Sequence, residues 1–337
     1  MTMELSTTNP WEAGERQPEH RRNAQLEEAL GFLNTYLQNA RGLLARPERP
    51  TKPVVFIVGC ARAGSTILFQ SLAASGAFAY PTNIMSRFYR DPYIGALIHR
   101  VLHDLDDRQE IFTDQEHAPK FESSLGKSKG ATSPHEFWYF WRSYFKFGVV
   151  QSELLHPPDA KERLALISDI AGIEEVFGKP VLMKAMELNW HIPLLRQLFP
   201  NSVFLFNNRD LLSNAMSLLK ARISHGGSEK TWYSYKPEEY ALISELPPWE
   251  QVVAQVWFTE RAVRRGLEGI PTEDVQEVAY ADLCKDPMEV HKRIRQRIGT
   301  LGKYEGPKSF TISGSAVPEE LRIRAEVILT HLPRIRA

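Results

Sequence analysis

The sequence of 337 residues has little cysteine, no excess of either charge and no long apolar run. Its two cysteines, Cys60 and Cys284, are too few for a disulfide framework and fit a reducing compartment. Forty-one basic residues balance forty-one acidic ones, so any anion site must be local. No run approaches the roughly 20 apolar residues of a membrane-spanning helix. We therefore expect a cytoplasmic protein without signal peptide, membrane anchor or bound nucleic acid.

The polar N-terminus precedes a leucine-rich stretch. Residues 1–19 show no apolar period, which predicts a flexible arm before one α/β domain at residues 20–337. The next apolar residues recur at steps of three and four, as on one face of a helix: Leu26, Leu30, Leu33, Leu37 and Leu44. This stripe either packs against its own domain or forms the seam of a homodimer.

Short apolar runs rich in β-branched and aromatic residues predict buried strands at 54–58, 180–183, 203–206 and 276–280. Helical patterns at 65–74 and 191–198 lie between them, and 78–80 predicts a further short strand. This alternation predicts an α/β fold, a parallel sheet with helices on both faces. Two loop-rich insertions, at about 104–134 and 224–248, interrupt it, and such insertions usually build the substrate side.

A glycine loop at residues 59–66 connects the first predicted strand directly to a helix. Gly59 and Gly64 have the spacing of phosphate-binding loops, whose backbone N–H groups point inward beside the positive end of a helix dipole. Nucleotide triphosphatases carry a lysine after the second glycine, but Ser65 stands there. Arg62 supplies a cation instead, and Thr66 adds a second hydroxyl. The loop predicts an anion site, unless its glycines serve only the turn.

With these residues the sequence resembles the P-loop sulfotransferases that use 3′-phosphoadenosine 5′-phosphosulfate (PAPS), whose loop commonly reads Pro-[Lys/Arg]-Ser-Gly-[Thr/Ser]-Thr. Here Ala61 and Ala63 replace the usual proline and serine. The resemblance covers roughly residues 52–301, with specific agreement in the loop, at 182–209 and at the Tyr-Ala-Asp-Leu segment 280–283. The last two segments resemble carbohydrate and tyrosylprotein sulfotransferases. The resemblance implies a bacterial-type enzyme that sulfates a hydroxyl group and needs no metal. The acceptor that it favours is a carbohydrate or glycolipid.

The resemblance also implies which residues bind the donor. An arginine followed eight residues later by a serine holds the 3′-phosphate in the family, which matches Arg209 and Ser217. Ser213 is the competing hydroxyl, although it could simply cap the helix. The resemblance implies that the glycine loop binds the 5′-phosphosulfate. The complete donor site that it implies is Arg62, Ala63, Gly64, Ser65, Thr66, Arg209 and Ser217.

Arg62 and Lys184 are the expected catalytic cations. Arg62 would face the 5′-phosphate and the sulfuryl oxygens as charge develops on the leaving group. Lys184, at the end of its predicted strand, matches a lysine that stabilises the transition state in similar enzymes. The alternative for Lys184 is an ordinary lysine at the surface.

The sequence does not single out one residue as the general base. Tyrosylprotein sulfotransferases have a glutamate about twenty residues after the loop arginine, but residues 80–83 contain no acid. Among carboxylates and imidazoles, we rank Glu136 first, His135 second and Glu122 third. Ser133 and Glu136 could instead form a capping box at a helix start. The aromatic stretch 137–141 that follows either packs in the core or stacks on an acceptor.

Two other functions fit the same loop. One is a P-loop kinase for a small metabolite, in which Arg62 replaces the missing lysine and magnesium is needed. The other is a nucleotide-binding protein of the same fold that has lost catalysis. The acceptor itself is not readable from the sequence, because acceptor specificity resides in insertions without a code.

Overall fold

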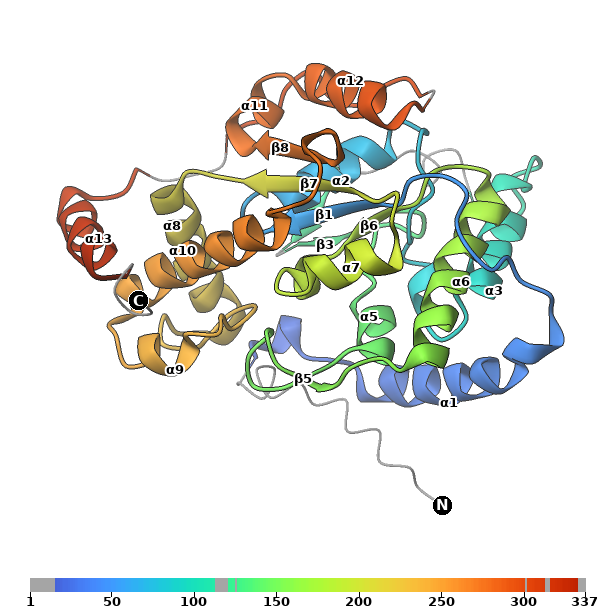
Figure 1. Cartoon of the computed structure of the whole chain (residues 1–337), viewed down its shortest axis with the longest axis horizontal. Helices are drawn as coiled ribbons and strands as arrows, with labels where there is room; N and C mark the ends of the chain where they lie inside the picture. The colour runs from blue at the N-terminus through green and yellow to red at the C-terminus, as the bar shows by residue number, and fades with distance from the viewer. Residues whose placement is uncertain (1–15, 113–120, 125, 301, 313–315, 333–337) are drawn as a thin grey trace.

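A computed structural model describes residues 16–112, 121–124, 126–300, 302–312 and 316–332. Within these residues the main sheet has four parallel strands in the order β6-β1-β7-β8, which confirms the predicted α/β fold (Figure 1). The strands are β1 (Val55–Gly59), β6 (Leu182–Lys184), β7 (Val203–Asn208) and β8 (Val275–Ala279). The predicted strand at 78–80 is reduced to one bridge, between Ala79 and Val181.

Side chains alternate across β1 and so supply both layers of the core. Val55 and Ile57 pack with α2 (Ser65–Ala73) and α12 (Pro287–Ile298). Phe56 and Val58 belong to the other layer, with α5 (Trp138–Tyr144), α6 (Ala160–Phe177) and α7 (Ile192–Leu198). The sheet is therefore covered on both faces, as the unbroken apolar run of its central strand requires.

A further cluster joins α8 (Leu211–Gly226), α10 (Pro248–Leu267) and α13 (Glu319–His331), on the left of Figure 1. Further helices are α3 (Pro92–His99), α9 (Tyr240–Ile243) and α11 (Tyr280–Lys285). None of the helices in the described ranges is long and apolar enough to cross a bilayer.

The two inserted regions differ from simple loops. The first contains the short hairpin of β2 (Ser123–Ser124) and β3 (Lys127–Ser128) in its described part. The second begins within α8 and contains α9. A further small hairpin pairs β4 (Lys146–Phe147) with β5 (Leu154–His156). Of the predicted N-terminal arm, residues 1–15 lie outside the described residues, and Gln17 N donates to the His225 carbonyl at 3.0 Å.

The leucine-rich helix is present as α1 (Ala24–Ala40), but most of the predicted stripe does not pack against its own domain. The homodimer seam stays a prediction. Leu30 and Asn34 are buried, whereas Leu33 is 38% exposed. The reason is polar: Asn34 Nδ2 donates to the Leu30 and Arg87 carbonyls at 2.9 and 2.8 Å. Its Oδ1 also accepts from Arg90 N at 2.9 Å. The bonds to Arg87 and Arg90, more than leucine packing, therefore set the orientation of α1.

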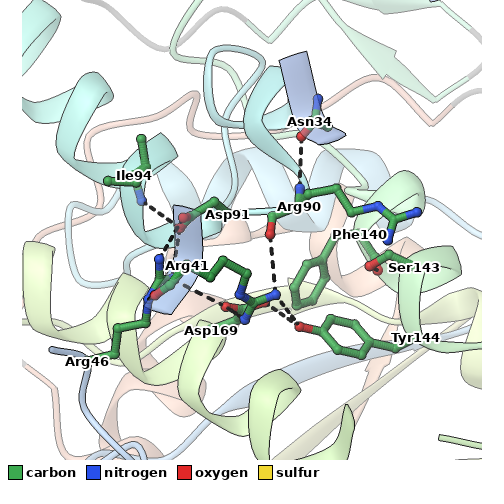
Figure 2. A network of polar contacts seen from close by, with 10 residues as sticks. All are labelled: Asn34, Arg41, Arg46, Arg90, Asp91, Ile94, Phe140, Ser143, Tyr144 and Asp169. Carbon is green, nitrogen blue, oxygen red and sulfur yellow. Dashed lines mark hydrogen bonds and ion pairs between the residues drawn. The ribbon is translucent and has the colours of Figure 1, made fainter. Parts of the chain in front are cut away.

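A buried network connects the end of α1 with α5 and α6 (Figure 2). Asp169 on α6 accepts from Arg41 and from the Tyr144 hydroxyl, the latter at 2.5 Å. Arg41 also donates to the Tyr144 oxygen at 3.1 Å. Nearby, Arg46 binds both carboxylate oxygens of Asp91, at 2.8 and 2.6 Å. The network fixes α5, the helix that follows Glu136 in the chain.

Candidate active site

Three predicted site segments meet at one edge of the sheet. Ile57 pairs with Lys184 on β6, and Gly59 pairs with Asn207 on β7. Because all four strands are parallel, the glycine loop, Lys184 and Arg209 emerge together at their carboxyl ends, the usual ligand edge of such sheets. Asn189 fixes the start of the loop: it accepts from Gly59 N at 3.1 Å and donates to Gly59 O at 2.8 Å. The sequence had given Asn189 no role.

The loop backbone requires its glycines. Gly59, Arg62 and Gly64 all have positive φ, at 141°, 66° and 97°. A Cβ on Gly64 would lie 2.3 Å from Tyr280 Cδ2, and one on Gly59 would lie 2.2 Å from the Asn207 carbonyl oxygen. Turns of this kind orient successive N–H groups inward, and α2 begins directly afterwards. The backbone of the loop therefore has the form that the sequence predicts for an anion site.

Arg209 is held between the loop and Tyr280. Its Nη1 donates to the Arg62 carbonyl at 3.1 Å, and its guanidinium carbon lies 4.5 Å from the centre of the Tyr280 ring. Burial lowers the pKa of Arg209, and the neighbouring Arg62 lowers it further. Tyr280 thus contacts both Gly64 and Arg209. Tyr280 belongs to the segment 280–283 of the family resemblance, but no role was assigned to it from the sequence.

The two candidate serines on α8 differ in their surroundings. Ser213 Oγ donates to Asp210 Oδ1 at 2.6 Å, so its hydroxyl is engaged in the cap of the helix. Ser217 lies one turn further along α8 and is half-buried. Of the two hydroxyls, that of Ser213 therefore serves the cap of α8, and the role of Ser217 stays a prediction.

Lys184 is not an exposed surface lysine. Its side chain is 5% exposed and forms an ion pair with Glu136 Oε1. Its Nζ also donates to Thr66 Oγ1 at 3.3 Å. The contact therefore joins three segments: the end of β6, the first turn of α2 and the residues before α5. A Cβ on Gly126, in the β2–β3 hairpin, would lie 3.1 Å from Glu136 Oε1, so this hairpin lies directly on the cluster.

Glu136 does not serve a helix start. Helix α5 begins at Trp138, and its N-cap is Phe137 with φ 56°. Ser133 Oγ donates to the Lys129 carbonyl instead of capping the helix. The capping-box interpretation of Ser133 and Glu136 is therefore wrong. Glu136 is one-third exposed, with its carboxylate between a buried cation and open space.

The other two base candidates are placed less well. His135 Nδ1 accepts from Phe137 N at 2.9 Å, so the proton of the neutral ring sits on Nε2, which then has no lone pair for a substrate. Burial, with Arg87 and Lys127 nearby, lowers the pKa of His135 to about 4. Glu122 is exposed and does not line the cavity beside Glu136.

A cavity of about 990 Å³ lies beside Glu136. Both inserted regions contribute to it, and its aromatic lining residues are Phe88, Trp138, Tyr139, Trp232, Tyr233 and Tyr235. The aromatic stretch is therefore divided, because Phe137, Phe140 and Trp141 are buried in the core. Tyr233 forms a hydrogen bond with the Arg62 side chain, which links the cavity to the loop. Burial and the nearby Glu136 and Glu187 carboxylates raise the pKa of Tyr235 well above its usual value.

One group in the described residues has metal-ligand geometry. The ligand atoms of His99, His103 and Asp104 lie within 4.8 Å of one another. His99 Nδ1 bonds to Thr82 Oγ1 at 3.1 Å, and His103 Nδ1 bonds to Asp104 at 2.7 Å. Burial raises the pKa of Asp104, but its hydrogen bonds to both histidines outweigh this and lower it to about 2. These three residues line neither the loop nor the cavity.

Comparison with known proteins gives a family match and a similar fold. The sequence model of the sulfotransferase family matches residues 53–301. The structure is similar to sulfotransferase STF9 from Mycobacterium avium, with a TM-score of 0.53 and 15% identity over 97% of this chain and 83% of that one. Sulfotransferase STF1 from Mycobacterium tuberculosis H37Rv has a TM-score of 0.46 and 14% identity, over 92% of this chain and 80% of that chain. No curated relative matches by sequence.

Proposed function

The chain belongs to the sulfotransferase family, and we propose that it transfers the sulfuryl group of PAPS to a hydroxyl of a carbohydrate or glycolipid. The observation that carries the proposal is the contact of Lys184 with both Glu136 and Thr66. It places a buried cation between the anion-binding loop and a carboxylate that faces a cavity. A sulfuryl donor on one side and a hydroxyl on the other would meet at this point.

The donor would bind along the edge of the sheet. Backbone N–H groups of Gly64 and Ser65, with the Thr66 hydroxyl, would hold the 5′-phosphosulfate at the start of α2. The N–H of Ala63, the other predicted donor contact, donates to the Cys60 carbonyl at 3.3 Å and is used inside the loop. The Arg209 guanidinium and the Ser217 hydroxyl would hold the 3′-phosphate. The missing loop lysine supports this choice over a nucleoside triphosphate, whose β and γ phosphates that lysine would contact.

The transfer needs a base for the acceptor hydroxyl and positive charge beside the sulfuryl group and the leaving phosphate. Glu136 would accept the proton of the acceptor hydroxyl, and the oxygen would attack the sulfur. The bond between sulfur and the phosphate oxygen would break, leaving adenosine 3′,5′-bisphosphate with the electron pair. Lys184 and Arg62 would stabilise the charge on the sulfuryl oxygens and the leaving phosphate, as fixed cations do in related transfers.

The cavity supports an acceptor of at least sugar size. Its volume of about 990 Å³ is ample for a glycoside. Tyrosine and tryptophan side chains such as Trp138 and Tyr233 offer apolar faces and polar edges, which suit sugar rings. Expected partners are therefore the donor and a glycan or glycolipid, with no metal in the transfer itself.

Titration calorimetry tests the donor assignment. Adenosine 3′,5′-bisphosphate should bind to the protein without magnesium, and Arg62→Ala should weaken it about tenfold or more, the loss expected for a charge-assisted contact. Tighter binding of ATP, dependent on magnesium, would support the kinase instead. Binding of the bisphosphate without any turnover, unchanged in Glu136→Gln, would support the nucleotide-binding protein without catalysis.

A further inference from the structure

Cationic side chains outnumber acidic ones on the walls of the cavity beside Glu136. Among the described lining residues the cations are Arg16, Arg21, Arg22, Arg87, Lys127 and Arg142, and the acids are Glu27, Glu136 and Glu187. The chain as a whole has forty-one of each sign. The excess of positive charge is therefore a local property of this cavity, and a local field of one sign selects ligands of the other.

The three acids of the cavity already have basic partners. The pairs are Glu136 with Lys184, Glu187 with Arg142 at 2.9 Å to its Nε, and Glu27 with Arg22 at 3.5 Å. Glu27 also accepts from the Tyr139 hydroxyl. Each lining carboxylate therefore already has a basic partner.

Arg21 and Arg87 are the clearest of these cations. Both are exposed, and neither guanidinium forms an ion pair with any described residue. Arg21 Nε makes only a long bond to the Arg16 carbonyl, at 3.4 Å. Arg87 lies close enough to His135, the neighbour of Glu136, to lower the pKa of that imidazole. Neither arginine belongs to the proposed donor site, so donor phosphates do not account for them.

We propose that the acceptor is an anion, whose carboxylate, phosphate or sulfate group binds Arg21 and Arg87 while its hydroxyl faces Glu136. This inference rests on the proposed function, because it takes the cavity as the acceptor site. Guanidinium groups bind such oxyanions through charge-assisted, often bidentate hydrogen bonds. A neutral glycan would fill the same cavity but leave these two cations without a counter-charge.

Binding of matched probes tests the inference without turnover. The protein is saturated with adenosine 3′,5′-bisphosphate and titrated with two fluorescent pairs. One pair is 4-methylumbelliferyl glucoside and the corresponding glucuronide, which tests a carboxylate. The other is 4-methylumbelliferyl N-acetylglucosaminide and its 6-sulfate, which tests an ester oxyanion. In at least one pair the anionic member should bind about tenfold more tightly, as expected for one charged hydrogen-bonding contact.

The variant Arg21→Gln/Arg87→Gln should reduce this preference to about threefold or less and leave binding of the neutral probe and of the bisphosphate unchanged. The control Arg108→Gln/Lys292→Gln removes the same charge at exposed positions outside the cavity, and it should keep the preference.

Three results would overturn the inference: no preference in either pair, no binding of any probe, or a preference that survives in Arg21→Gln/Arg87→Gln. Binding of the bisphosphate is measured in the same experiment. If it binds and the probes show no preference, only the anionic acceptor is refuted. If the bisphosphate does not bind, the proposed donor fails first, and the acceptor inference falls with it.

Discussion

Replacing Glu136 with glutamine tests its role as general base while changing the surrounding structure little. The amide keeps the size of the side chain, and its oxygen can still accept from Lys184, but it cannot take a proton. General-base catalysis contributes roughly 10² to 10⁴ in rate, so we expect kcat to fall by that factor in Glu136→Gln. The substitution leaves the Lys184 cation, whose side chain is 5% exposed, without its charge partner, so it should also cost about 2 to 3 kcal/mol of folding free energy.

The assay measures release of adenosine 3′,5′-bisphosphate from PAPS with 4-methylumbelliferyl glucuronide as acceptor. Binding of the bisphosphate should change less than about threefold, because Glu136 is not in the proposed donor site. The control Glu122→Gln removes the same type of carboxylate from the exposed first insertion and should leave the rate within about twofold. The assignment is refuted if Glu136→Gln keeps more than about a tenth of the wild-type rate.

Three further substitutions test the donor site and the framework. Arg209→Gln should weaken adenosine 3′,5′-bisphosphate about tenfold or more but leave adenosine 5′-monophosphate unaffected, since only the former has the 3′-phosphate; equal losses in calorimetry would argue against the assignment. The pKa of His135 lies near 4 in the fold instead of 6.5. The unfolded chain therefore gains the proton first, and stability should fall by up to about 3 kcal/mol from pH 6.5 to pH 4. In urea unfolding, the stability of His135→Asn should fall less than that of the wild type between pH 6.5 and pH 4. The same pH dependence in both proteins would contradict this prediction. Asp169→Asn removes a buried carboxylate that both Arg41 and the Tyr144 hydroxyl contact, and it should lower the unfolding free energy by about 3 kcal/mol; a loss below about 1 kcal/mol would show that the network of Figure 2 contributes little.

The elements that the sequence predicts well are those encoded by adjacent residues. The apolar run of β1 and the spacing of Gly59 and Gly64 are local patterns, and strand, loop and helix follow directly. Lys184 at the end of β6 also falls where the pattern puts it. The position of these elements at one edge follows from parallel pairing, which alternating strands and helices already indicate.

Contacts between distant segments were not readable in the same way. Glu136 and Lys184 lie 48 residues apart, and their pairing depends on how the chain before α5 returns to the sheet. Asn189 and Tyr280 act through close approach to the loop glycines, a property that single residue types do not signal. A glycine in the first insertion, Gly126, had no motif around it, yet the hairpin that contains it lies on the Glu136 carboxylate.

The packing of the α1 leucine stripe against its own domain was predicted wrongly for a related reason. Periodicity locates a helix but assumes that its apolar face is the one that packs. Here one buried amide, Asn34, makes hydrogen bonds to two neighbouring carbonyls and one backbone N–H. These bonds turn the helix so that Leu33 faces outward. A polar residue within a helical pattern can therefore decide the orientation.

Transfer of label from the donor tests the central claim most directly. The protein is incubated with PAPS carrying ³⁵S and with fractions of cell-envelope glycans, lipids and small phenols, beside parallel reactions with γ-³²P-ATP. The account predicts ³⁵S on a hydroxyl-bearing acceptor in the wild type, strong loss of that label in Arg62→Ala, and no transfer of ³²P. Transfer of ³²P, or no ³⁵S on any fraction while the protein binds the bisphosphate, would contradict it.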